Sequence, residues 1–536
     1  METSEHKQVG DQIRIETLGN HYLRGSKDLS LDPTNNLKVR MMHSVDGIPV
    51  PLDPELSAGD FVMAADYFTK AGWGYELTLP PQTGDVVADN EALFEIPISA
   101  QESRAFREAY EDLASPTVKR SDIDEIYRIE NKTYIPFVKS LNSLFQQAVY
   151  YFAIKDYGNK LNLNVAHFTP WSTRAYLVGH ESALRMATLA FYFKQLAEGK
   201  PGEIPEDYHD ELNSIIQKIK AGGDYHFTEA QLADNQAIFT ELWQRYHALA
   251  VSRDLFIMHF YSDHFAGGHM GRIGLLRETM PKKFGFLGGI LINNMHNEDN
   301  TDSVTVTPPY DRDSDAYTEN RDDSQAYGDG TYSEKRNDNT ANLLINGMDN
   351  SLGDIARLMT TGERPDAKDY GGLTFLPAID YTKPQPPPLL IYGPDQKIYF
   401  REEISKITKL SPQDYRNTLA DPAGNGYKEL TYFQAAKLVL KLRVFGFFYS
   451  PTPVKPEVKL GISLRPKAAA PVRGAEHLVK INDSTAQTEP TFTGEHRGAL
   501  RRSFGEQVSH SLLSPPKDSS DKERVVDHQL ATNYGC

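Results

Sequence analysis

The stretch from Thr228 to Met270 reads TEAQLADNQAIFTELWQRYHALAVSRDLFIMHFYSDHFAGGHM. It opens with the capping-box pattern Thr-x-x-Gln, which marks the start of a helix. Apolar residues then recur at helical spacing, at Ile238, Leu242, Leu249, Leu255 and Met258. The pattern predicts one unbroken helix from Glu229 to Asp263, which at ~1.5 Å per residue is more than about 50 Å long.

The end of this predicted helix carries a candidate metal site. His259 and Asp263 are four residues apart, so they project from one helix face and can share a cation. The two glycines at 267 and 268 allow a sharp turn that returns His269 toward the same point. Imidazole nitrogen and carboxylate oxygen suit a borderline cation such as zinc. The alternative is that these histidines are ordinary core residues with satisfied hydrogen bonds.

Two further segments, Pro136 to Tyr157 and Arg174 to Leu196, show the same helical periodicity. Convincing strands are few, with one short hairpin expected around Val304 to Thr307. We therefore expect a mainly α fold with a multi-helix catalytic core. Composition places boundaries that leave a domain at 1–383, which carries the candidate metal site and is the expected metal-dependent catalytic domain, a Pro-rich linker with a small helical appendage at 384–450, and a flexible C-terminal tail at 451–536.

The overall composition excludes several classes of protein. The 536 residues are 39% hydrophobic and 24% charged, and no apolar run is long enough for a transmembrane helix. The single cysteine, Cys536, rules out an internal disulfide and a thiolate metal cluster, so a metal site must use His, Asp and Glu. The formal net charge of -16 disfavours nucleic acid as a partner.

Half of the net charge lies between Asn297 and Asn339, where 12 acidic residues face 4 basic ones. The many Gly, Pro, Asn and Asp residues predict a long loop, and loops of this length are usually functional or disordered. Asp311, Asp313 and Asp315, followed by Glu319 and Asp322, also resemble an EF-hand calcium loop, although the glycine at its sixth position is replaced by Ala316. A calcium-binding helical interaction protein is therefore one alternative.

Three other histidines are candidate ligands. His167 precedes the helix that contains His180, and either residue alone is weak evidence. His296 opens the acidic loop and is followed by Glu298 and Asp299, either of which can complete a site with it. The alternative for His296 is a polar helix cap.

Several sequence blocks resemble one enzyme family. Residues 263–270, DHFAGGHM, resemble the D-x-F-[SA]-[AG]-G-H-M block of a zinc-dependent phospholipase C family found in Pseudomonas, fungi and, as secreted effectors, Legionella. In the same order as in that family stand LSAGDFVMAADYF (56–68), NVAHF (164–168), YLVGHESAL (176–184), HNEDN (296–300) and AYGDG (326–330). Ala166 replaces the usual Asp before the histidine. The resemblance covers residues 60–342 and leaves out the tail.

The resemblance implies a set of site residues. The family is similar to clostridial phospholipases C and single-strand-specific nucleases, which are all-α folds with a three-zinc cluster. It implies two or three Zn²⁺ ions, catalytic roles for Asp66 and Asp263, and substrate contacts from Tyr327 and Asp329. The implied metal ligands are Asp66, His167, His180, His259, Asp263, His269, His296 and Asp299. For the N-terminal ligand of those enzymes, His6 and His21 both stay open.

These implications lead to an expected activity. A divalent cation lowers the pKa of water from ~15.7 toward ~7, and paired cations hold the attacking and leaving oxygens of a phosphoester. We expect a zinc-dependent phospholipase C that hydrolyses phosphatidylcholine-like glycerophospholipids to diacylglycerol and a phosphorylated headgroup. A nuclease or phosphatase on the same fold is the main alternative. Transient membrane contact is expected from residues 284–287 or Trp171, unless these residues pack in the core.

The chain begins without the apolar segment of an ordinary secretory signal. We therefore expect either a cytoplasmic protein or an effector that is secreted without such a signal and translocated into a host cell. The polar tail from Pro451 to Cys536 is the expected export signal in the second case.

Overall fold

The structure is a computed structural model that describes residues 3–25, 36–81, 86–134, 139–270, 272–307, 325–328, 330–332, 334–404 and 408–442. Helices dominate these residues, and the short strands form three small antiparallel sheets. The prediction of a mainly helical fold is confirmed. The predicted tail at 451–536, the calcium-like loop at 311–322 and Asp329 lie outside the described residues.

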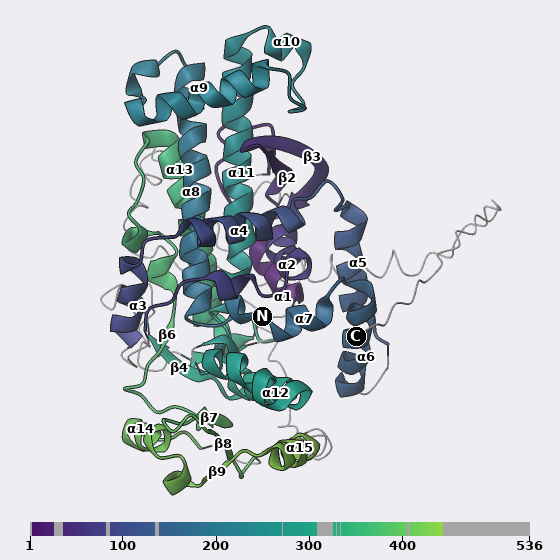
Figure 1. The fold of residues 1–536 in the computed structure, drawn as a ribbon, viewed down its shortest axis with the longest axis vertical. Helices are drawn as coiled ribbons and strands as arrows, with labels where there is room; N and C mark the ends of the chain where they lie inside the picture. The colour runs from purple at the N-terminus through teal and green to yellow at the C-terminus, as the bar shows by residue number, and fades with distance from the viewer. Residues whose placement is uncertain are drawn as a thin grey trace, which may run out of the picture.

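Three long helices form the centre of the molecule. Helices α8 (Trp171–Ala197) and α11 (Asn235–Asp263) lie side by side along the long axis, and α13 (Asp338–Thr361) packs against both (Figure 1). Almost all of α11 after its first turns is buried, because α8, α2, α13 and β2 surround it. Because the helix is covered on every side, its charged residues are buried as well, and residues such as Arg245 and Asp254 pair with other side chains inside the protein.

The prediction of one unbroken helix from Glu229 to Asp263 is wrong at its start. The Thr228 capping box begins only a short helix, α10 (Glu229–Leu232). Asp234 then adopts an extended conformation, and its side chain accepts a hydrogen bond from the Gln236 amide at 2.9 Å, which caps the start of α11. The 29 residues of α11 span about 44 Å at ~1.5 Å per residue.

The N-terminal layer is built on a hairpin. Strands β2 (Lys38–Val45) and β3 (Ile48–Ser57) pair antiparallel through the two-residue turn Asp46-Gly47. Both turn residues have positive φ, 52° and 85°, which is the geometry that Asp-Gly supplies in tight hairpins. The short strand β1 (Leu23–Arg24) adds to the other edge of β2.

Strand β3 leads directly into the helix that carries Asp66. Ser57 and Asp60 form a reciprocal capping box at the start of α2 (Ala58–Phe68). Helix α1 (Thr3–Gly10), which carries His6, packs against α2 and reaches the end of α11 (Figure 1). The helices that follow in the sequence are α3 (Val86–Glu95), α4 (Ala100–Leu113), α5 (Arg120–Glu130), α6 (Lys139–Ala153) and α7 (Tyr157–Asn162). Helix α9 (Glu206–Lys220) lies at one end of the long helices α8 and α11 (Figure 1).

Below the long helices lies α12 (Gly274–Asp302), which bends at Gly285. Residues 297–302 are therefore helical, and the predicted acidic loop starts later than expected. Where a short hairpin was expected around Val304 to Thr307, the structure has the single strand β4 (Val304–Thr307), which pairs with β5 (Gln325–Ala326) and with β6 (Ala378–Ile379).

The C-terminal part of the described chain packs under α12. It contains β7 (Leu390–Tyr392), β8 (Ile398–Arg401), β9 (Tyr427–Glu429), α14 (Pro412–Ala420) and α15 (Tyr432–Leu440), so it is a mixed unit and not a purely helical appendage (Figure 1). The proline-rich segment before it is buried from Gln385 to Pro388. The side-chain oxygen of Gln385 accepts a hydrogen bond from the backbone N–H of Thr305 at 3.1 Å, which links this segment to β4.

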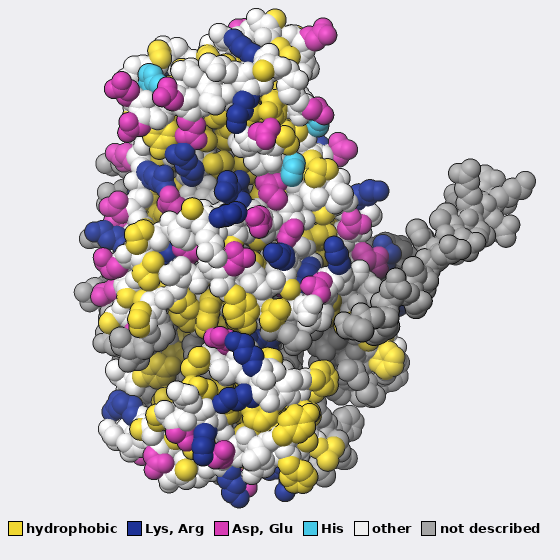
Figure 2. Space-filling model, viewed as in Figure 1, with side chains coloured by type: hydrophobic (Ala, Val, Ile, Leu, Met, Phe, Trp, Pro, Cys, Tyr) yellow, Lys and Arg dark blue, Asp and Glu magenta, His cyan; other side chains and the backbone are white. Residues whose placement is uncertain are grey.

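Among the described helices, none combines the length and the apolar character that a bilayer crossing requires. Exposed hydrophobic side chains gather over the lower part of the molecule (Figure 2). Of the predicted membrane-contact residues, Phe286 is 81% exposed, whereas Phe284 is buried and Trp171 is half-buried.

Candidate metal centre

The centre forms at the last turn of α11. His259 and Asp263 are both buried, and His259 Nε2 lies 3.5 Å from Asp263 Oδ2, as the four-residue spacing predicts. The other nitrogen, Nδ1, donates to the carbonyl of Val62 on α2 at 2.8 Å. Within the described part of the chain, Nε2 is a buried nitrogen without a hydrogen bond. A buried imidazole whose proton is fixed on the far side presents its lone pair to the centre, as a metal ligand must.

His6 reaches the same carboxylate from α1. The Ser262 hydroxyl donates to the His259 carbonyl at 2.7 Å, so its oxygen accepts from His6 Nδ1 at 2.9 Å. The proton is again held on the outer nitrogen, and His6 Nε2 lies 3.2 Å from Asp263 Oδ1. The structure thus distinguishes between the two N-terminal candidates, because His21 is exposed and its ring lies tilted against that of Tyr22.

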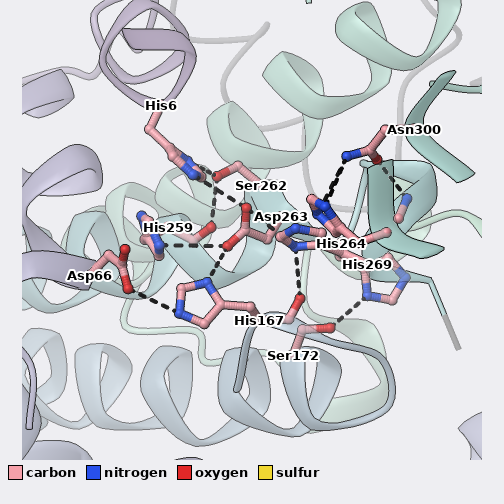
Figure 3. Close-up of polar contacts among 12 residues, drawn as sticks. His6, Asp66, His167, Ser172, His259, Ser262, Asp263, His264, His269 and Asn300 are labelled. Atoms are coloured by element: carbon pink, nitrogen blue, oxygen red, sulfur yellow. Dashed lines mark hydrogen bonds and ion pairs between the residues drawn. The ribbon is translucent and has the colours of Figure 1, made fainter. Parts of the chain in front are cut away.

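Asp66 and His167 complete the group. His167 lies in the single 3₁₀ turn η2 (Val165–His167), with Nδ1 2.6 Å from Asp263 Oδ2 and Nε2 3.2 Å from Asp66 Oδ1. Asp66 projects from α2, and its side chain remains 36% exposed. His167 is therefore a bridge between the buried Asp263 and the more accessible Asp66 (Figure 3).

Two overlapping groups in this cluster are able to hold a metal ion. One is His6, His259 and Asp263, and the other is Asp66, His167 and His259; within each group the candidate ligand atoms lie within 4.8 Å of one another. His259 belongs to both groups. The donor set is imidazole and carboxylate, which divalent transition metals accept, and the orphaned His259 Nε2 is the atom that a cation would satisfy.

His269 returns to the centre through the predicted glycine turn. Its Nδ1 donates to the His167 carbonyl at 3.2 Å and lies 3.5 Å from Asp263 Oδ1. A β-carbon on Gly268 would stand 2.6 Å from the His296 carbonyl, so this close approach to α12 requires glycine. The His296 ring lies 4.7 Å from the His269 ring, which extends the row of imidazoles toward α12.

The charges of the cluster follow from its burial. Burial and the neighbouring His6 lower the pKa of His259 to about 3, so this imidazole is neutral at pH 7. Burial also acts to lower the pKa of His167, but the carboxylates of Asp66 and Asp263 outweigh it and raise that pKa to about 9. The His167 imidazole is thus charged at neutral pH, and a cation bound there must displace its proton.

The two acids predicted beside His296 are held by arginines. Asp299 is buried, and its Oδ1 accepts from Arg272 at 2.8 Å. Glu298 accepts from Arg401 of β8 at 2.8 Å. Arg272 also donates to the Pro386 carbonyl at 2.6 Å. The Glu298–Arg401 contact joins α12 to β8 of the C-terminal unit, and Arg272 joins Asp299 of α12 to the proline-rich segment.

His180 lies apart from the cluster, in a second buried network. Its Nδ1 is 2.7 Å from Asp254 Oδ1, its Nε2 is 3.2 Å from Asp354 Oδ2, and Ser351 hydrogen-bonds to Asp254. Both ring nitrogens are occupied by carboxylates from α11 and α13. The structure therefore does not bring the predicted ligand His180 together with His259.

This second network gives a pH-dependent stability. Asp254 and Asp354 outweigh the effect of burial and raise the pKa of His180 to about 9. Because the folded pKa exceeds the unfolded value of about 6.5, this stabilisation is complete below pH 6.5 and is lost as the pH rises through 9. The difference in unfolding free energy between wild type and Asp354→Asn, measured with urea, should shrink by as much as about 3 kcal/mol between pH 6 and pH 10. A difference that does not change with pH would contradict this role.

A small cleft leads from the surface to the cluster. It is open to solvent and has Asp66 and His167 among its lining residues. Lys160 of α7 and the exposed Lys70 also line it, together with apolar side chains that include Leu163 and Phe260. Asp66 is the one acidic residue among the described residues that line this cleft. The predicted substrate residue Tyr327 lies instead in another cleft, lined also by Glu5 and Tyr332.

Sequence reasoning missed the outer partners and the basic residues of the cleft. Ser262, the Val62 carbonyl and Lys160 had no local signal, because their roles arise from contacts between distant elements. Of these, only Ser262 could be suspected from the sequence, because it stands between His259 and Asp263 in the predicted helix. Comparisons of this chain with protein-family models, with curated proteins and with solved structures give no match.

Proposed function

We propose that this protein is a metal-dependent phosphoester hydrolase, and specifically a zinc-dependent phospholipase C. The observation that supports the proposal best is the convergence of His6, Asp66, His167, His259 and Asp263 at the inner end of a cleft. These residues come from α1, α2, η2 and α11. Such a set, with one buried nitrogen lacking a hydrogen bond, is typical of a metal centre and not of ordinary core packing.

The interior residues and the cleft-lining residues of this centre would have different roles. His6, His259 and Asp263 lie in the interior and would hold a cation, with outer hydrogen bonds fixing which nitrogen of each imidazole faces inward. Asp66 and His167 reach the cleft and would face substrate as well as cation. A bound divalent cation supplies Lewis-acid polarisation of a phosphoryl oxygen and lowers the pKa of water.

Asp66 is the residue placed to handle the proton. The charged His167 beside it outweighs burial and holds the pKa of Asp66 below its ordinary value, so the carboxylate is ionised at neutral pH. An ionised carboxylate is the form that coordinates a cation and also the form that accepts a proton from water. Because the Asp66 side chain is partly exposed, it is the acidic residue of the cluster that a substrate in the cleft would contact.

Hydrolysis assays with the zinc-loaded full chain test the proposal. We expect release of diacylglycerol and a phosphorylated headgroup from mixed micelles of glycerophospholipid, loss of that release on chelation, and its return when zinc is added back. The Asp263→Asn variant should give no release under the same conditions. Cleavage of single-stranded DNA without lipid hydrolysis would assign a nuclease instead, and hydrolysis of neither substrate would overturn the proposal.

A further inference from the structure

The cleft beside Asp66 carries a positive charge that the proposed reaction does not by itself require. Lys160 lies on α7 and is partly buried in the cleft wall. Its ammonium group donates to the carbonyl of Tyr67, the residue that follows Asp66 on α2. An ammonium group has three N–H donors, so this anchor leaves donors for a ligand in the cleft.

The cleft lacks what a cationic headgroup needs. A quaternary ammonium group is bound by exposed aromatic faces or by acidic side chains. Asp66 is the one acid among the described lining residues, and it belongs to the metal cluster. The two aromatic rings of the lining, Trp73 and Phe260, are 6% and 1% exposed and pack edge-to-face on each other with ring centres 5.0 Å apart.

We propose that Lys160 is a specificity-determining residue, which selects phosphoesters whose headgroup carries no positive charge and disfavours choline. The ammonium would donate to a hydroxyl oxygen of a headgroup such as glycerol. A choline group in the same place would meet Lys160, and Lys70 at the rim, with a like charge. This inference rests on the proposed phosphoester hydrolysis and narrows its substrate class.

Monomeric substrates separate this selectivity from the charge of a membrane surface. The zinc-loaded full chain would be assayed on dihexanoyl-phosphatidylglycerol and dihexanoyl-phosphatidylcholine, each below its micelle concentration. We expect kcat/KM to favour the glycerol lipid, and Lys160→Gln to lower that preference about ten-fold, because the hydrogen bond to the glycerol headgroup and the like-charge repulsion of choline are both lost. Lys160→Arg should keep the preference, and so should Lys155→Gln, which removes an exposed lysine that does not line the cleft.

A binding measurement keeps the test independent of turnover. Calorimetric titration with glycerol phosphate and with phosphocholine should show tighter binding of glycerol phosphate, weakened about ten-fold in Lys160→Gln. Equal kcat/KM on the two lipids, or a preference unchanged in Lys160→Gln, overturns the inference and leaves the phospholipase proposal standing. If neither lipid is hydrolysed, the proposed function fails, and the titration alone decides: equal binding of the two phosphates, or no effect of Lys160→Gln, overturns the role of Lys160.

Discussion

Replacing His259 by alanine is expected to abolish zinc binding and to reduce phosphoester hydrolysis by about a thousand-fold or more. His259 is shared by both groups of candidate ligands, so its loss leaves neither group complete. A cation contributes several kcal/mol to stabilising a phosphoryl-transfer transition state, and each 1.36 kcal/mol is a factor of ten in rate. The measurements are zinc content by mass spectrometry after dialysis and the hydrolysis rate of the dialysed protein.

His21→Ala is the matched control for this experiment. His21 is an exposed histidine that sequence reasoning could not separate from His6 as the N-terminal ligand. We expect His21→Ala to retain zinc and activity and His6→Ala to lose zinc, with thermal melting used to show that each variant is folded. A folded His259→Ala protein with wild-type zinc content and rate would show that this cluster is not the centre.

The largest effect on stability is expected from Glu102→Ala. Glu102 and Arg174 are both fully buried, and their carboxylate and guanidinium groups meet in two hydrogen bonds of 2.7 and 3.0 Å. Arg174 also donates to the backbone carbonyls of Leu93 and Ile96, which fixes the loop between α3 and α4 on α8. Removing the carboxylate leaves a buried, uncompensated guanidinium, which typically costs about 3–5 kcal/mol.

Urea unfolding of the variant measures this cost. Glu108 lies on the same helix as Glu102 but is exposed, so Glu108→Ala should change the unfolding free energy by less than about 0.5 kcal/mol. Arg174 outweighs burial and lowers the pKa of Glu102 to about 2, so the stabilisation by Glu102 is present above pH 4.5 and falls as the pH drops toward 2. Equal effects of the two substitutions at pH 7 would refute the buried ion pair.

Local sequence patterns predicted the part of the centre that lies within one turn of chain. The spacing of His259 and Asp263 was enough to place them on one face, and the two glycines before His269 predicted its return. The predicted start of the long helix was wrong because two helix-start signals follow each other. After the Thr228 capping box, the capping side chain of Asp234 starts a new helix within an apparently continuous apolar pattern. The predicted acidic loop also began too early, because the acidic composition of residues 297–302 suggested a loop, whereas α12 continues through them.

Contacts between distant elements lay beyond the reach of local patterns. His6 forms a hydrogen bond with Ser262, which is 256 residues away in the sequence. His180 forms hydrogen bonds with Asp254 and Asp354, which lie on two other helices. Nothing in the chain near His180 distinguishes a metal ligand from a member of a buried ion network. The difference is decided by which carboxylates the packing of α8, α11 and α13 brings to each ring nitrogen.

The central claim is that the cluster around His259 and Asp263 holds zinc, and metal analysis of the purified, unchelated full chain tests it most directly. The two overlapping ligand groups predict at least one zinc atom per chain, lost in Asp263→Asn and retained in the control variant His21→Ala. Absence of zinc and of any other divalent metal from a folded chain, even after incubation with excess zinc, would contradict the account. It would make His6, His167 and His259 members of a buried polar network only.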